Sequence, residues 1–352
     1  MSGVRERLKR VWPVSLGAVL LAATLFPVGA AWCDQYRDDR PAAPTERLSI
    51  DVQGTGRSYY LHFPSGSRAA PWSLVLVLHG AGGNAPDTLS MQRWIEASDL
   101  NGFILVGLEA RPPRVWLPVN FRFNPRVWNS GDPSVQEESI LKNDDVAYVR
   151  AVLDELGRRY TIDPNRVYAA GFSSGGGMTQ RLAVELGERF AAIAAVGSLR
   201  AQSAAPRAPL SVLLIYGRRD PVLPYEGGTR VTPWGDFPGM PPVSSTIAAW
   251  VGDLHCGGDA QTTQPGPLVQ RQVWKDCDAG TEVQAVTVED LGHHWAGSRP
   301  DGMKESMAGP QSQAFDDTSE IWAFFAAHPR HGARPHAVDT PEAIETPVPA
   351  GH

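Results

Sequence analysis

The chain has 352 residues, of which 42% are hydrophobic, and carries a formal net charge of −6 at pH 7. This length and apolar content are sufficient for a full buried core, in one large domain or two small ones. The acidic balance offers no electrostatic attraction to nucleic acid or to anionic membranes, so we expect neither as a partner.

The first thirty residues are typical of a secretory signal peptide. Four basic residues among the first ten precede an apolar run from Val11 to Ala30, which ends in small residues. A transmembrane anchor is the alternative, since the run approaches a spanning length, but its prolines favour cleavage near Ala30 or Ala31. We therefore expect a signal peptide at 1–31, a secreted or periplasmic protein, and no stable membrane insertion after cleavage.

The remaining chain divides by composition. We predict a polar linker at 32–46, a folded domain at 47–328 and a disordered tail at 329–352, which is rich in proline and charge. Cys256 and Cys277 enclose a short loop, and in an exported protein we expect a disulfide there, with two free thiols as the alternative. Lipid attachment at Cys33 is poorly supported, because Trp32 occupies the position where a lipoprotein signal needs a small residue.

Strands and helices alternate along the domain. After a hairpin at 48–63, apolar runs predict strands at 72–78, 103–107, 167–170, 191–196, 210–216, 269–274 and 282–288. Helical patterns fall at 88–98, 144–160, 174–186, 244–254 and 318–327, with Asp144 or Asn143 able to cap the second of these, and we assign Asp145 to the same capping role. This alternation predicts a mostly parallel sheet with helices on both faces.

The segment 111–143 is long and irregular and contains four large aromatic residues. Long loops in compact domains are usually functional or disordered, and the aromatic residues argue against disorder. We expect this segment to cover or line a cleft, although its rings could instead pack against the core.

The chain is organised around 171–175, which fits the Gly-x-Ser-x-Gly pattern of a nucleophile on a sharp strand-to-helix turn. A buried strand precedes this pattern and a helix follows it. The free N–H groups at the helix N-terminus would favour a nearby oxyanion. We therefore predict that Ser173 is a nucleophile.

A serine hydroxyl needs an imidazole to accept its proton, and the imidazole needs a carboxylate to fix its tautomer. Ser173, Asp220 and His293 follow one another in the order of an α/β-hydrolase triad, each after a predicted strand. Asp236 and Asp253 are weaker candidates for the acid. His293 is adjacent to His294, but no further ligand completes a zinc-like spacing, so we expect no metal and no cofactor.

An oxyanion hole should combine the backbone N–H of Ser174 with one from the loop after the strand at 72–78, most plausibly that of Ala81. His79 is expected to support that loop. Trp128 and Trp295 are expected to line the substrate cleft, with core packing as the alternative.

Together these segments resemble the polyhydroxybutyrate depolymerase-like esterases, a family of secreted α/β-hydrolases that includes feruloyl and acetylxylan esterases. Two motifs are the most specific, an Asp-Pro-x-Arg-Val-Tyr run before the strand-to-helix turn at 171–175, called here the nucleophile elbow, and a Gly-His-x-Trp motif. The resemblance is carried by 76–80, 143–146, 162–168, 171–176, 216–220 and 292–297. It implies that His293, two residues before the tryptophan, is the catalytic histidine, and that Cys256 pairs with Cys277. The chain departs from the family at Ala296, where the family has proline.

These observations predict a secreted serine carboxylesterase whose partner is an ester substrate, free or attached to a polymer. Feruloyl or acetyl esters of polysaccharide and hydroxyalkanoate oligomers are the expected substrates. The alternatives are a polyhydroxybutyrate depolymerase proper, a serine peptidase on the same fold, and a binding protein that has lost the chemistry.

Overall fold

The computed structural model describes residues 45–66 and 70–330. The predicted signal peptide, the linker up to residue 44, Cys33 and the tail from residue 331 lie outside this part. Within it, no helix combines the length and apolar character needed to cross a bilayer.

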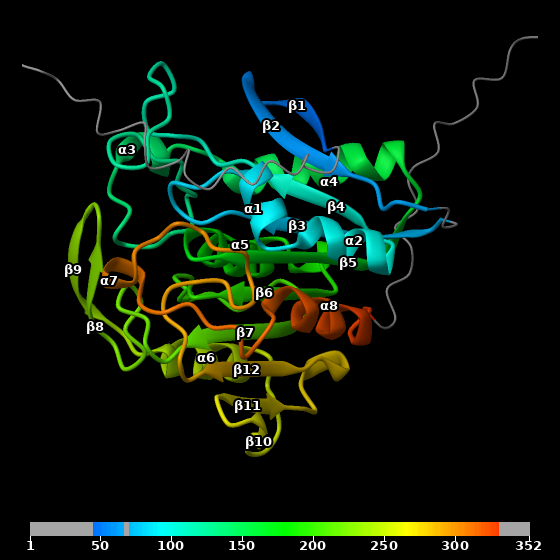
Figure 1. The fold of residues 1–352 in the computed structure, drawn as a ribbon. Helices are drawn as coiled ribbons and strands as arrows, with labels where there is room; N and C mark the ends of the chain where they lie inside the picture. Colours follow the sequence, from blue (N-terminus) through cyan, green and yellow to red (C-terminus); the bar gives the residue numbers. More distant parts are fainter. Residues whose placement is uncertain (1–44, 67–69, 331–352) are drawn as a thin grey trace, which may run out of the picture. The chain divides into compact units, whose positions relative to one another are not determined.

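A ten-stranded sheet forms the centre of the domain (Figure 1), in the order β1-β2-β4-β3-β5-β6-β7-β12-β11-β10. The strands from β4 to β12 in this order are parallel, and the strands on either side of them pair antiparallel. The bounds of the ten strands are β1 (Glu46–Val52), β2 (Thr55–His62), β3 (Trp72–Leu78), β4 (Ile104–Leu108), β5 (Ile162–Phe172), β6 (Ala192–Val196), β7 (Ser211–Gly217), β10 (Gln261–Gly266), β11 (Val269–Trp274) and β12 (Val283–Val288).

Helices cover both faces of this sheet, as the apolar parallel strands require. One face packs against α4 (Asp145–Arg159), α5 (Ser174–Glu185) and α6 (Val243–Asp253). The other face packs against α1 (Ala85–Met91), α2 (Trp94–Asn101) and α8 (Asp317–Ala327). The short helices are α3 (Glu138–Leu141), α7 (Glu305–Ala308) and the 3₁₀ turns η2 (Gly187–Arg189) and η3 (Asp278–Gly280).

Several predicted elements differ from those observed. The single helix expected at 88–98 is two helices, because Arg93 takes a left-handed conformation (φ 60°) between α1 and α2. Strand β10 was not predicted, nor was a separate two-stranded hairpin of β8 (Gly228–Thr232) and β9 (Gly235–Met240). Both segments are rich in glycine, proline and polar residues and lack the apolar alternation of a half-buried strand.

Two predictions about polar residues are settled by local geometry. Asp144 caps α4, since its Oδ1 accepts a hydrogen bond from the Ala147 N–H at 2.8 Å. Asp145 is instead completely buried and forms an ion pair with Arg57 at 2.7 Å, so assigning it to the helix cap was wrong. The disulfide between Cys256 and Cys277 is confirmed.

Candidate active site

Ser173 occupies the turn between β5 and α5 in a strained backbone conformation, with φ 53° and ψ −119°. The turn is held by two backbone hydrogen bonds, from the Ser173 N–H to the Val196 carbonyl and from the Gly177 N–H to the Ser173 carbonyl. A Cβ at Gly175 would lie 2.2 Å from the Leu78 carbonyl oxygen, so only glycine allows α5 to begin this close to β3. The elbow therefore holds the serine hydroxyl above the carboxyl ends of the central strands.

Ser173, His293 and Asp220 form one hydrogen-bonded chain. The Ser173 Oγ lies 2.9 Å from His293 Nε2, and His293 Nδ1 lies 2.7 Å from Asp220 Oδ2. The side chains of His293 and Asp220 are 8% and 2% exposed, so water competes little for these bonds. The structure thus brings together the three residues that the sequence order had selected.

The hydrogen bonds to the other carboxylate oxygen of Asp220 determine which atoms donate and which accept along the Ser173–His293–Asp220 chain. Oδ1 accepts the backbone N–H groups of Val222 and Leu223, at 2.8 and 2.6 Å. Oδ2 is left to accept the Nδ1–H of His293, so Nε2 carries a lone pair towards the Ser173 hydroxyl. The arrangement can accept the serine proton and stabilise the resulting imidazolium.

Two backbone N–H groups belong to residues that line the cavity beside Ser173. Ala81 and Ser174 both line it, and in the part of the chain that the structure describes neither amide donates a hydrogen bond to the protein. The buried Trp128 supports this region, because its Nε1–H donates to the His79 carbonyl at 2.9 Å and its backbone N–H donates to Ser174 Oγ at 3.3 Å. Unsatisfied donors of this kind suit a developing oxyanion.

His79 supports the same loop as a neutral imidazole. Its Nδ1–H donates to the Gly80 carbonyl at 2.7 Å, and its Nε2 accepts the Ala110 N–H at 3.1 Å. Burial, together with the nearby Arg126 guanidinium, lowers the pKa of His79 to about 4. The residue therefore stays uncharged at neutral pH and serves the loop structurally, as its position in the sequence had suggested.

His294 does not line the cavity and forms two hydrogen bonds of its own. Its Nδ1 lies 2.7 Å from Asp301 Oδ2, and its Nε2 lies 2.9 Å from the Gly309 carbonyl oxygen. Both partners are acceptors, so both ring nitrogens carry protons. Burial alone would lower the pKa of His294, but these hydrogen bonds and the Asp301 charge outweigh it and raise the pKa. These contacts favour the charged form of His294 and hold it apart from the His293 chain.

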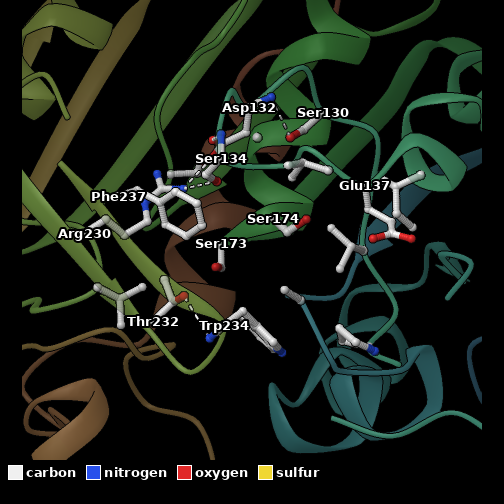
Figure 2. Close-up of a pocket in the computed structure, with 18 of the residues that line it drawn as sticks. Ser130, Asp132, Ser134, Glu137, Ser173, Ser174, Arg230, Thr232, Trp234 and Phe237 are labelled. Atoms are coloured by element: carbon white, nitrogen blue, oxygen red, sulfur yellow. Dashed lines mark hydrogen bonds and ion pairs between the residues drawn. The ribbon is translucent and has the colours of Figure 1, made fainter. Parts of the chain in front are cut away.

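The cavity above Ser173 has a volume of about 480 Å³ (Figure 2). Residues of the 111–143 segment supply much of its wall, which agrees with the expectation that this segment lines a cleft. In Figure 2, Asp132, Ser134 and Arg230 lie to one side of Ser173 and Glu137 lies to the other.

Trp128 and Trp295 do not line this cavity, contrary to expectation. Trp128 is completely buried and Trp295 is 3% exposed, each with its indole N–H bonded inside the protein, Trp128 to His79 and Trp295 to Thr318. The aromatic wall is instead made by Phe123, Trp234 and Phe237. The last two belong to the β8–β9 hairpin, which carried no recognisable strand signal.

Among the described residues, no group of three or more His, Cys, Asp or Glu side chains is arranged to hold a metal ion.

The fold and the site together define an α/β-hydrolase. A solved acetyl xylan esterase from Aspergillus awamori has the same fold, with a TM-score of 0.51 at 14% identity, over 71% of this chain and 94% of that one. The chain matches the family described as Esterase PHB depolymerase over residues 57–251, more than half its length, and it belongs to this family.

Two relatives agree with this assignment. The esterase NocK of Nocardia uniformis subsp. tsuyamanensis, whose name specifies no substrate, is 33% identical over 274 residues, or 72% of this chain and 75% of NocK. Feruloyl esterase B of Piromyces equi is 27% identical over 247 residues, or 67% of this chain but only 42% of that protein. The protein is therefore a carboxylic-ester hydrolase.

Proposed function

We propose that the protein is a secreted serine carboxylesterase that acts through an acyl-enzyme on Ser173. The observation that carries the proposal is the Ser173–His293–Asp220 chain, with contacts of 2.9 and 2.7 Å, opening into a cavity beside two free backbone N–H groups. The disulfide between Cys256 and Cys277 supports export, since such bonds persist in oxidising compartments.

In the proposed mechanism, Ser173 Oγ attacks the ester carbonyl carbon as its proton passes to His293 Nε2. The N–H groups of Ala81 and Ser174 stabilise the oxyanion of the tetrahedral intermediate, and Asp220 stabilises the imidazolium. The intermediate collapses as the imidazolium gives its proton to the departing alcohol, which leaves an acyl group on Ser173. His293 then takes a proton from water as the water oxygen attacks the acyl carbon. The second tetrahedral intermediate collapses as the imidazolium returns this proton to Ser173 Oγ, and the acid is released.

The proposed substrates are feruloyl or acetyl esters of polysaccharide, or hydroxyalkanoate oligomers. The names of the relatives support the first two, since they include a feruloyl esterase and a bifunctional acetylxylan esterase/xylanase from Neocallimastix patriciarum. The third is supported by the description of the family. A cavity with both aromatic and hydroxyl-bearing walls suits an ester that joins an apolar acid to a polar alcohol.

The test compares initial rates on p-nitrophenyl acetate, p-nitrophenyl butyrate and methyl ferulate for wild type, Ser173→Ala and His293→Ala. We expect both variants to lose at least about 10³-fold in kcat with all three esters. The ranking of the esters in wild type selects among the proposed substrates. Full activity in Ser173→Ala would refute the proposal.

A further inference from the structure

Two segments that are distant in sequence meet over Ser173. One is the segment 111–143, called here the cover loop, and the other is the β8–β9 hairpin, residues 228–240. Both contribute side chains to the cavity wall, including Asp132 from the cover loop and Arg230 from the hairpin. Among the described residues, the two strands of the hairpin pair with each other and not with the central sheet. An isolated two-stranded hairpin is marginally stable in water, so its position depends on its contacts with the rest of the protein.

The first contact joins Arg230 to the cover loop. Arg230 Nη1 donates to Asp132 Oδ2 at 2.6 Å and to Ser134 Oγ at 3.2 Å. The Ser134 N–H in turn donates to Asp132 Oδ1 at 2.8 Å, so the carboxylate is already oriented. The two charged side chains are 12% and 26% exposed, a partly buried position in which an ion pair is screened less than at the surface.

Charge at this contact is maintained across the neutral pH range. Burial alone would raise the pKa of Asp132, but the Arg230 charge and the hydrogen bonds from Arg230 and Ser134 outweigh it, and the pKa is lowered. The carboxylate is therefore ionised wherever the enzyme is expected to work.

The second contact joins Trp234 to the cover loop near the candidate oxyanion hole. Trp234 Nε1–H donates to the Phe121 carbonyl at 2.9 Å, and the two rings lie 5.1 Å apart. The Phe121 ring fills the space that a Cβ of Gly82 would need, at 2.4 Å. Gly82 follows Ala81 directly, so the hairpin is linked through Phe121 to the loop that carries one of the two free N–H groups.

We propose that Arg230 and Trp234 are specificity-determining residues, which hold the β8–β9 hairpin against the cover loop and so limit the size of ester that reaches Ser173. This inference rests on the proposed function of Ser173. With both contacts made, an ester group must fit the 480 Å³ cavity between the two segments. With either contact broken, the hairpin can move away and larger groups can enter.

The test measures kcat/KM in two substrate series. The acyl group is varied in p-nitrophenyl acetate, butyrate and decanoate, and the alcohol is varied in methyl and 1-naphthyl acetate. In at least one series, Arg230→Met, Asp132→Asn and Trp234→Ala should each raise the ratio of the largest to the smallest substrate about tenfold, the scale of size discrimination in apolar pockets. Unchanged ratios in both series would overturn the proposal.

A double variant separates a shared contact from two independent effects. Arg230→Met with Asp132→Asn should shift the ratio no further than the stronger single variant, because the second change removes a contact that is already broken. Single effects that multiply in the double variant would overturn the proposal.

Arg271→Met is the matched control. Arg271 and Glu320 form an ion pair of similar exposure (26% and 24%) between β11 and α8, and neither residue lines the cavity. The ratio of kcat/KM for the largest to the smallest substrate should stay unchanged in this variant. A shift as large as that in the Arg230 variant would show that loss of any partly buried ion pair admits larger esters, which would overturn the proposal. Thermal unfolding of each variant establishes that it is folded. Activity that survives in Ser173→Ala would refute the serine mechanism itself, so the two failures are distinguishable.

Discussion

Replacing Asp220 by asparagine tests the proton arrangement of the site with almost no change in shape. In the wild type, Asp220 Oδ1 accepts two backbone N–H groups and Oδ2 accepts the Nδ1–H of His293. In Asp220→Asn, the amide oxygen must face the two backbone donors, because an NH₂ group there would meet N–H groups. The NH₂ group then faces His293 and donates to Nδ1.

This reversal inverts the histidine tautomer. With Nδ1 accepting, the proton moves to Nε2, which then donates to Ser173 Oγ at the 2.9 Å contact and can no longer accept a proton from it. The same inversion in serine proteases lowers kcat about 10⁴-fold, equivalent to about 5.5 kcal/mol of transition-state stabilisation. We expect a loss of this size in kcat for p-nitrophenyl acetate at pH 7.5, with little change in KM.

The matched control is Asp253→Asn. This change neutralises a carboxylate that forms an ion pair with Arg200, and Asp253 does not line the cavity. Asp253 was also a rival for the acid in the sequence. Its variant should retain kcat within about twofold. A loss of less than tenfold in Asp220→Asn, in protein that unfolds at the wild-type temperature, would refute the tautomer argument.

Three further predictions concern stability. His294→Gln should keep kcat but lower the thermal midpoint. Because folding raises the pKa of His294, its contribution to stability is full below about pH 6.5 and is lost as pH rises through the pKa of the folded state. The difference in thermal midpoint between wild type and His294→Gln should therefore be smaller at pH 9 than at pH 6. An equal difference at the two pH values would contradict this. Gly175→Ala should cost about 3 kcal/mol in urea unfolding, since its Cβ would strike the Leu78 carbonyl, and wild-type stability would refute the close-approach argument. Burial raises the pKa of Asp317 well above its usual range, so above about pH 4 the unfolded chain gives up this proton more readily than the folded protein, and stability falls. Asp317→Asn, which can still accept the Ala296 N–H, should therefore gain about 1 kcal/mol at pH 8 and nothing near pH 4; a loss at pH 8 would count against this assignment.

The parallel sheet and the order of its functional residues could be predicted from the sequence. Strands buried on both faces appear as continuous apolar runs, and polar residues that follow them lie at one edge of the sheet. This is why Ser173, Asp220 and His293 could be selected without knowledge of their distances.

Properties that depend on contacts between distant residues could not be predicted in this way. Asp145 looked like part of a helix cap, but its partner Arg57 is 88 positions away. Trp128 looked like a cleft residue, yet its indole N–H is bonded to His79 in the interior. The β8–β9 hairpin contributes no residue to the core clusters of the described part of the chain, which fits its lack of an apolar pattern. Arg230, which contacts Asp132 across 98 positions, was missed with it.

The central claim is that Ser173 becomes covalently acylated, and mass spectrometry of the intact protein after treatment with a fluorophosphonate tests it most directly. We predict one adduct in the wild type, located on Ser173 by peptide mapping, and none in Ser173→Ala. Ester hydrolysis should be lost in proportion to labelling. An unlabelled wild type that still hydrolyses p-nitrophenyl acetate, or equal labelling of Ser173→Ala, would contradict the account.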